Sequence, residues 1–141
     1  MPLPPVLDRF LQAQEPVWTR VQAELTAGEK RTHWMWFVFP QLQGLGHSEM
    51  ASRYGITSLS EALAYAIHPI LGSRLRECCE LLLKQTHSAS ALEIFGSPDN
   101  LKLQSSMTLF ALASPSDACF ERVLGKFYGG VRDRRTLELL R

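Results

Sequence analysis

The chain has 141 residues, of which 45% are hydrophobic and 21% are charged. This length and composition are typical of one globular domain and exclude an intrinsically disordered chain. The 15 Lys and Arg residues nearly balance the 14 Asp and Glu residues, so the formal net charge of +1 gives no field able to hold a polyanion. We therefore expect one domain over residues 1–141 without a nucleic-acid partner, and we interpret Arg132, Arg134 and Arg135 as the solvated face of a last helix.

The cysteines and the start of the chain bear on where the protein is located. Cys78 and Cys79 are adjacent and Cys119 stands alone, which is not the pattern of a disulfide framework and favours reduced thiols. The first residues, MPLPPVLDRF, have neither the basic start nor the apolar run of a signal peptide. Since no run of about 18 apolar residues is present either, we expect a cytoplasmic protein without a membrane partner.

The first part of the chain predicts helices. Asp8 is expected to cap a first helix, and Pro16 to open a second helix that Gly28 closes. The apolar run WMWFVF at residues 34–39 is compatible with a strand or a helix, and we interpret it as helical.

The second half of the chain carries further start and stop signals. A helix is expected from Ser60, which would be its N-cap, and another with Pro69 at its first position. A short helix over residues 88–95 should be stopped by Gly96, and Pro98 should start a long one.

The last part of the chain predicts two more helices. Gly129 should end the first of them, and Asp133 should cap a last helix that runs to Arg141. The predicted fold class is therefore all-α, a compact single domain of about six or seven helices.

Familiar catalytic and ligand motifs are absent from the sequence. There is no GxSxG elbow, no GxxxxGK[ST] phosphate loop, no GxGxxG fingerprint and no HExxH. The histidines at positions 33, 47, 68 and 87 lack the short spacing of zinc ligands. We expect neither a metal site nor a cofactor.

Residues 30–48, KRTHWMWFVFPQLQGLGHS, form the densest cluster of unusual residues. One interpretation places the aromatic side chains in the core, with the glycines shaping a bend. The other is a cleft with a cationic lip, in which a flat ring stacks on an aromatic side chain and charged groups hold a phosphate.

A second cluster begins the helix that follows Pro98. Asp99, Lys102 and Ser105 recur at three- and four-residue spacing and would share one side of that helix. They are interpreted either as an exposed Asp-Lys pair with a packing serine, or as groups that face the cleft of the first cluster.

Several strings resemble a known family: HWMWFVFPQ, GLGHSEMASRYGI, AYAIHPILGSRL, IFGSPDNLKLQSSMTLF and FYGGVRDRRTL. Together they resemble the bacterial domain-of-unknown-function family numbered eighteen-ten, some members of which are labelled calpastatin. The resemblance covers about residues 8–140 and implies a small all-helical fold of an orphan type, but it implies no activity. The calpastatin label does not fit, because the composition is not that of a disordered, repetitive inhibitor.

Two classes of function follow from these observations. The first is a pocket that binds, with hydrolysis as an open extension, a nucleotide-derived or ADP-ribose-like small molecule. The second is a non-enzymatic protein-interaction module or homodimerising domain, so that monomer and homodimer both stay open. For the first class, His33 and Asp99 are the candidate acid or base groups. The candidate ligand-binding residues are Lys30, Arg31, His33, Trp34, Trp36, Gln41, Ser48, Tyr54, Lys102 and Ser105.

Overall fold

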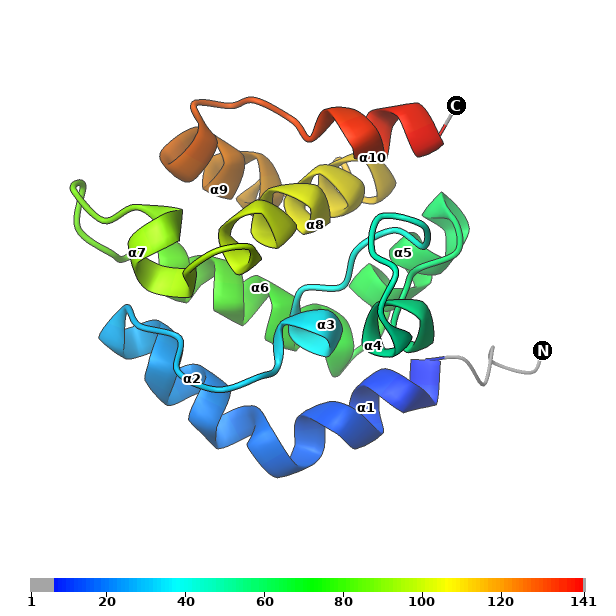
Figure 1. The fold of residues 1–141 in the computed structure, drawn as a ribbon, viewed down its shortest axis with the longest axis horizontal. Helices are drawn as coiled ribbons and strands as arrows, with labels where there is room; N and C mark the ends of the chain where they lie inside the picture. Colours follow the sequence, from blue (N-terminus) through cyan, green and yellow to red (C-terminus); the bar gives the residue numbers. More distant parts are fainter. Residues whose placement is uncertain (1–6, 141) are drawn as a thin grey trace.

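The structure, a computed structural model, describes residues 7–140 and is all-α, as predicted (Figure 1). Ten α-helices and one 3-10 helix lie in this part of the chain: α1 Asp8–Gln14, η2 Glu15–Val17, α2 Trp18–Ala27, α3 Met35–Val38, α4 Glu49–Arg53, α5 Leu59–Ile67, α6 Leu71–Leu83, α7 Ala91–Phe95, α8 Asp99–Ala113, α9 Cys119–Tyr128 and α10 Arg134–Leu139. The number exceeds the six or seven expected. Helices α3, α4 and α7 have only four or five residues each, and α4 corresponds to no helix expected from the sequence.

Helix α8 is the centre of the fold. It contacts α5, α7, α9 and α10, and Figure 1 shows it crossing the molecule with α9 and α10 above it and α6 below. Every residue from Ser105 to Ala111 is buried. A helix that is covered on all sides in this way belongs to the interior of a hydrophobic core, and the buried apolar side chains form one cluster around it.

Local signals in the sequence set most helix ends. Gly28 ends α2 with φ of 74°, and Gly129 ends α9 with φ of 62°, a left-handed backbone that glycine adopts without steric cost. Ser90 and Glu93 form a reciprocal capping box at the start of α7. The side chain of Asp133 caps α10, as predicted. The end expected for this helix, Arg141, lies outside the described residues, as do residues 1–6 at the start of the chain.

Two expected N-caps were placed wrongly. Asp8 is the first residue of α1 and Leu7 precedes it, so the carboxylate lies in the first turn, where the helix dipole favours it. At α5 the cap is Ser58 and not Ser60: Ser58 has extended backbone and its Oγ accepts a hydrogen bond from the N–H of Glu61 at 3.1 Å.

Helix α6 begins two residues later than predicted, at Leu71, and Pro69 lies outside it. The Nδ1 atom of His68 accepts hydrogen bonds from the N–H groups of Ile70 and Leu71, at 3.1 and 3.2 Å. The His68 side chain therefore satisfies two backbone N–H groups at the start of α6, whose N-cap residue is Ile70.

The predicted helix over the WMWFVF run is present as the single turn α3. The chain then crosses to a parallel bridge between Leu42 and Ile56, the isolated β-bridge found in residues 7–140. Hydrogen bonds at 2.7 and 2.8 Å join the backbone of Ile56 to Gln43 and Gln41. This bridge holds the glycine-containing loop after α3 beside the segment that leads into α5.

None of the helices between Leu7 and Leu140 combines the length and the hydrophobicity that crossing a bilayer requires.

Candidate functional site

A buried carboxylate fixes the segment between α2 and α3. Glu24 is 8% exposed, and its Oε1 accepts hydrogen bonds from the N–H of Arg31 at 2.8 Å and from the indole N–H of Trp34 at 2.9 Å. The hydroxyl of Thr32 donates to Oε2 at 2.7 Å. Burial by itself raises the pKa of Glu24, but the hydrogen bonds from Thr32, Arg31 and Trp34 outweigh it and lower the pKa from 4.5 to about 2. Nothing in the sequence indicated this role for Glu24.

The same segment is tied to the start of α8. The backbone N–H of Lys30 donates to the carbonyl of Ile94 at 2.7 Å, and Lys30 Nζ lies 2.9 Å from Asp99 Oδ2. The other carboxylate oxygen, Asp99 Oδ1, lies 3.6 Å from Lys102 Nζ. The Lys30 side chain is only 7% exposed. Two lysines from distant parts of the chain thus share one carboxylate.

These ion pairs form part of the wall of a hollow of about 270 Å³, which we call the lysine hollow. Its lining residues are Lys30, His33, Met35, Trp36, Ser97, Pro98, Asp99 and Lys102. Trp36 is half-buried, and Lys102 Nζ lies 5.2 Å from the centroid of its ring, a cation-π distance. The hollow therefore joins an aromatic surface to two ammonium groups.

A second hollow of about 290 Å³, the arginine hollow, adjoins the first, because Pro98 and Lys102 line both. Its lining residues are Gln41, Leu45, Gly46, Pro98, Leu101, Lys102, Ser105, Asp133 and Arg135. Arg135 was interpreted as part of a solvated helix face, and nothing in the sequence linked it to residues 41–46.

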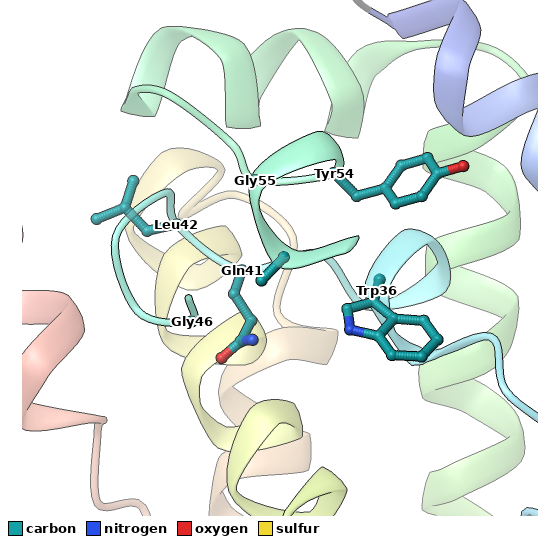
Figure 2. A pocket seen from close by; sticks show the side chains of 7 residues that line it. Trp36, Gln41, Leu42, Gly46, Tyr54 and Gly55 are labelled. Carbon is teal, nitrogen blue, oxygen red and sulfur yellow. The ribbon is translucent and has the colours of Figure 1, made fainter. Parts of the chain in front are cut away.

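A small cavity of about 10 Å³, enough for one water molecule, shares lining residues with both hollows. It shares Trp36 with the lysine hollow, and Gln41 and Gly46 with the arginine hollow. Figure 2 shows the Gln41 and Trp36 side chains extending from this cavity, with Gln41 directed toward the ribbon of α8. The three spaces therefore meet around Trp36, Gln41 and Lys102.

Most of the residues proposed from the sequence lie around these spaces. The residues in question are Lys30, His33, Trp36, Asp99 and Lys102 in the lysine hollow, Gln41, Lys102 and Ser105 in the arginine hollow, and Trp36, Gln41 and Tyr54 in the small cavity.

Two of these residues are largely engaged elsewhere. The Tyr54 ring packs against Phe37 with centroids 5.3 Å apart, and Figure 2 shows it pointing away from Gln41. The Ser105 hydroxyl donates to the carbonyl of Leu101 at 3.2 Å, within its own helix.

Three proposed residues lie outside the hollows. Trp34 is 1% exposed and its indole N–H is bonded to Glu24, so its ring is not available to stack on a ligand. The guanidinium of Arg31 is 75% exposed and pairs with Glu29. Ser48 caps α4 by accepting a hydrogen bond from the N–H of Ala51.

The thiols belong to a different part of the molecule. Cys78 and Cys79 are buried in the core, and burial raises the pKa of Cys78 well above its ordinary range. Over residues 7–140, no group of three or more His, Cys, Asp or Glu side chains is arranged to hold a metal ion.

Comparison with known proteins gives a family but no activity. The family model described as "Protein of unknown function (DUF1810)" matches residues 4–140. A solved structure, that of the conserved hypothetical protein Rv1873 from Mycobacterium tuberculosis, is 57% identical in sequence, covers 95% of both chains and superposes with a TM-score of 0.93. The search of curated proteins found no match.

Proposed function

The chain belongs to the DUF1810 family of proteins of unknown function, and we propose that it binds a small phosphorylated compound with an aromatic ring, such as a nucleotide or an ADP-ribose-like molecule. The lysine hollow is the proposed place of binding. Lys30 and Lys102 would hold the phosphate and Trp36 would contact the ring.

One arrangement carries this proposal: two lysines and a half-buried tryptophan, from segments far apart in the sequence, line a single hollow. A surface lysine usually extends into water, whereas the Lys30 side chain is 7% exposed and held in place by Asp99. Ammonium groups that are fixed in this way donate charge-assisted hydrogen bonds to a phosphate. An indole face is a surface on which a planar ring stacks.

The size of the lysine hollow suits a small ligand. Its volume of about 270 Å³ lies just below the range of about 300–1,000 Å³ that is usual for small-molecule pockets. His33 is exposed at its rim and adds an imidazole that can donate or accept a hydrogen bond.

Isothermal titration with AMP, NAD and ADP-ribose tests the proposal. We expect Lys102→Ala to weaken binding about tenfold, because it removes one charge-assisted hydrogen bond from the phosphate. Lys84→Ala is the matched control, since Lys84 is an exposed lysine that lines none of the hollows. The proposal fails if none of the three compounds binds, or if the Lys102 and Lys84 variants bind equally well.

Hydrolysis of the bound compound is a separate question with its own test. His33 and Asp99 are the side chains of the lysine hollow that could exchange a proton with a ligand, although Asp99 is also the partner of both lysines. Incubation with ADP-ribose, followed by chromatography for AMP, decides between binding and turnover. Any turnover should be lost in His33→Ala or Asp99→Ala.

A second candidate function, association with another copy of the chain, is favoured by one face of α5. Leu59, Leu63 and Ile67 recur every four residues and are 39%, 41% and 70% exposed. Sedimentation velocity over a range of concentrations tests it: a dimer that Ile67→Glu converts to monomer supports this function, and a wild-type monomer at all concentrations rejects it.

A further inference from the structure

The arginine hollow adjoins the proposed binding place, because Lys102 and Pro98 line both hollows. The small cavity shares Trp36 with the lysine hollow and Gln41 with the arginine hollow. A ligand held at Lys102 would therefore lie next to a second space of similar size.

The charged groups of the arginine hollow favour an anion. Arg135 is exposed, and its guanidinium has no ion-pair partner among the residues that the structure describes. The carboxylate of Asp133 faces the same hollow, but its Oδ2 already accepts hydrogen bonds from the N–H and the hydroxyl of Thr136, at 2.9 and 2.6 Å. The carboxylate is thus largely engaged, while the guanidinium is available to a ligand.

Gln41 adds an uncommitted polar group at the junction. Its side-chain amide has no hydrogen-bond partner within residues 7–140, and Figure 2 shows it extending from the small cavity toward α8. An amide of this kind can donate to an oxygen and accept from a hydroxyl. Leu101, 57% exposed, gives the hollow an apolar floor.

We propose, as a deepening of the proposed function on which it rests, that the two hollows form one bipartite site whose ligand is a pyrophosphate-linked compound of two moieties. The aromatic moiety lies at Trp36 in the lysine hollow, and the bridging phosphates lie at Lys102. The second moiety lies in the arginine hollow, where Arg135 and Gln41 contact it. Together the two hollows reach the size that ligands of this class need, whereas each alone lies just below it.

The test compares AMP, which the lysine hollow can hold alone, with ADP-ribose, which has the second moiety. We expect ADP-ribose to bind about ten times more tightly than AMP, because a guanidinium adds at least one charge-assisted contact. Arg135→Ala should remove that advantage and leave AMP binding unchanged. Arg134→Ala is the matched control: Arg134 is the next residue in the same helix, its side chain is 91% exposed, and it lines neither hollow.

The outcomes separate the two proposals. If AMP and ADP-ribose bind equally well, or if Arg135→Ala and Arg134→Ala have the same effect, the bipartite site is wrong while the lysine hollow stands. If neither compound binds, and NAD does not bind either, the proposed function fails and the bipartite site fails with it.

Discussion

Replacement of Glu24 by glutamine tests how the segment that carries Lys30 is held. The substitution keeps the size of the side chain but removes the charge that accepts the hydrogen bonds from Arg31, Thr32 and Trp34. A pKa that falls from 4.5 in the unfolded chain to about 2 in the folded protein corresponds to about 3 kcal/mol of stability at pH 7, since one pKa unit is worth about 1.4 kcal/mol.

The pH dependence has a definite sign. Because the folded pKa of Glu24 lies below the unfolded one, its contribution is complete above about pH 5 and is lost as the pH falls through 4.5 toward 2. About 1.4 kcal/mol should remain at pH 3. The free-energy difference between wild type and Glu24→Gln should therefore shrink by about half between pH 7 and pH 3.

Urea denaturation followed by circular dichroism measures this difference at both pH values. Glu29→Gln is the control, because Glu29 belongs to the same segment but its carboxylate is 58% exposed and bonded only to the exposed side chain of Arg31. The control should unfold like the wild type. A loss below about 1 kcal/mol at pH 7, or an equal loss at pH 7 and pH 3, would show that the ionised carboxylate of Glu24 does not stabilise this segment.

Three further predictions concern other parts of the fold. Asp133→Ala removes the cap of α10 and should lower the free energy of unfolding by about 1 kcal/mol in urea titrations, whereas an unchanged midpoint would show that the cap is dispensable. Gly72→Ala would place a Cβ against the backbone oxygen of Ala66, too close for a van der Waals contact. We therefore expect the free energy of unfolding to fall by more than about 3 kcal/mol, or the protein not to fold. A melting temperature like that of wild type would contradict this close contact. Iodoacetamide should label Cys119 first, because this thiol is half-buried and a hydrogen bond from Cys79 lowers its pKa. The thiols of Cys78 and Cys79 are buried and should react later. Mass spectrometry of the labelled peptides measures the order of labelling, and any other order would contradict this prediction.

Helix boundaries were predictable where their signals were local. Gly28, Gly129 and Asp133 act through their own backbone conformation or through a neighbour three residues away, and these predictions were confirmed. Ser58 was also recognisable, because Glu61 follows it at the spacing of a capping box, whereas Ser60 is followed by leucine at that spacing.

The sequence could not predict which aromatic side chains of residues 34–39 are fully buried and which are partly exposed. Trp34 and Trp36 flank the start of a helix of a single turn, which is too short to show a periodicity. Trp34 is the buried one of the two because Glu24, a residue of α2, accepts a hydrogen bond from its indole N–H in the interior. In sequence, Glu24 looks like any exposed acidic residue of an amphipathic helix.

The position of the two hollows next to each other could not be predicted either, because it depends on contacts between segments far apart in the sequence. The spacing of Asp99 and Lys102 predicted their pairing within α8, and the structure has it at 3.6 Å. The sequence could not show that Lys30 would bind the same carboxylate. Nor could it show that Arg135 and Gln41 would line the same hollow, because tertiary packing alone brings α10 to the loop after α3.

The carboxylate of Asp99 makes the lysine hollow a site that already has an occupant. Any anion that enters must compete for Lys30 with the carboxylate of Asp99, which lies 2.9 Å from Lys30 Nζ. Because this carboxylate is part of the protein, it acts at a high effective concentration. The affinity for an anion then depends on how much more strongly the two ammonium groups bind the anion than they bind the carboxylate of Asp99. Under the proposed function, a ligand that brings a ring to Trp36 along with its phosphate would have a second source of binding energy, and Asp99 would make the lysine hollow selective for such ligands.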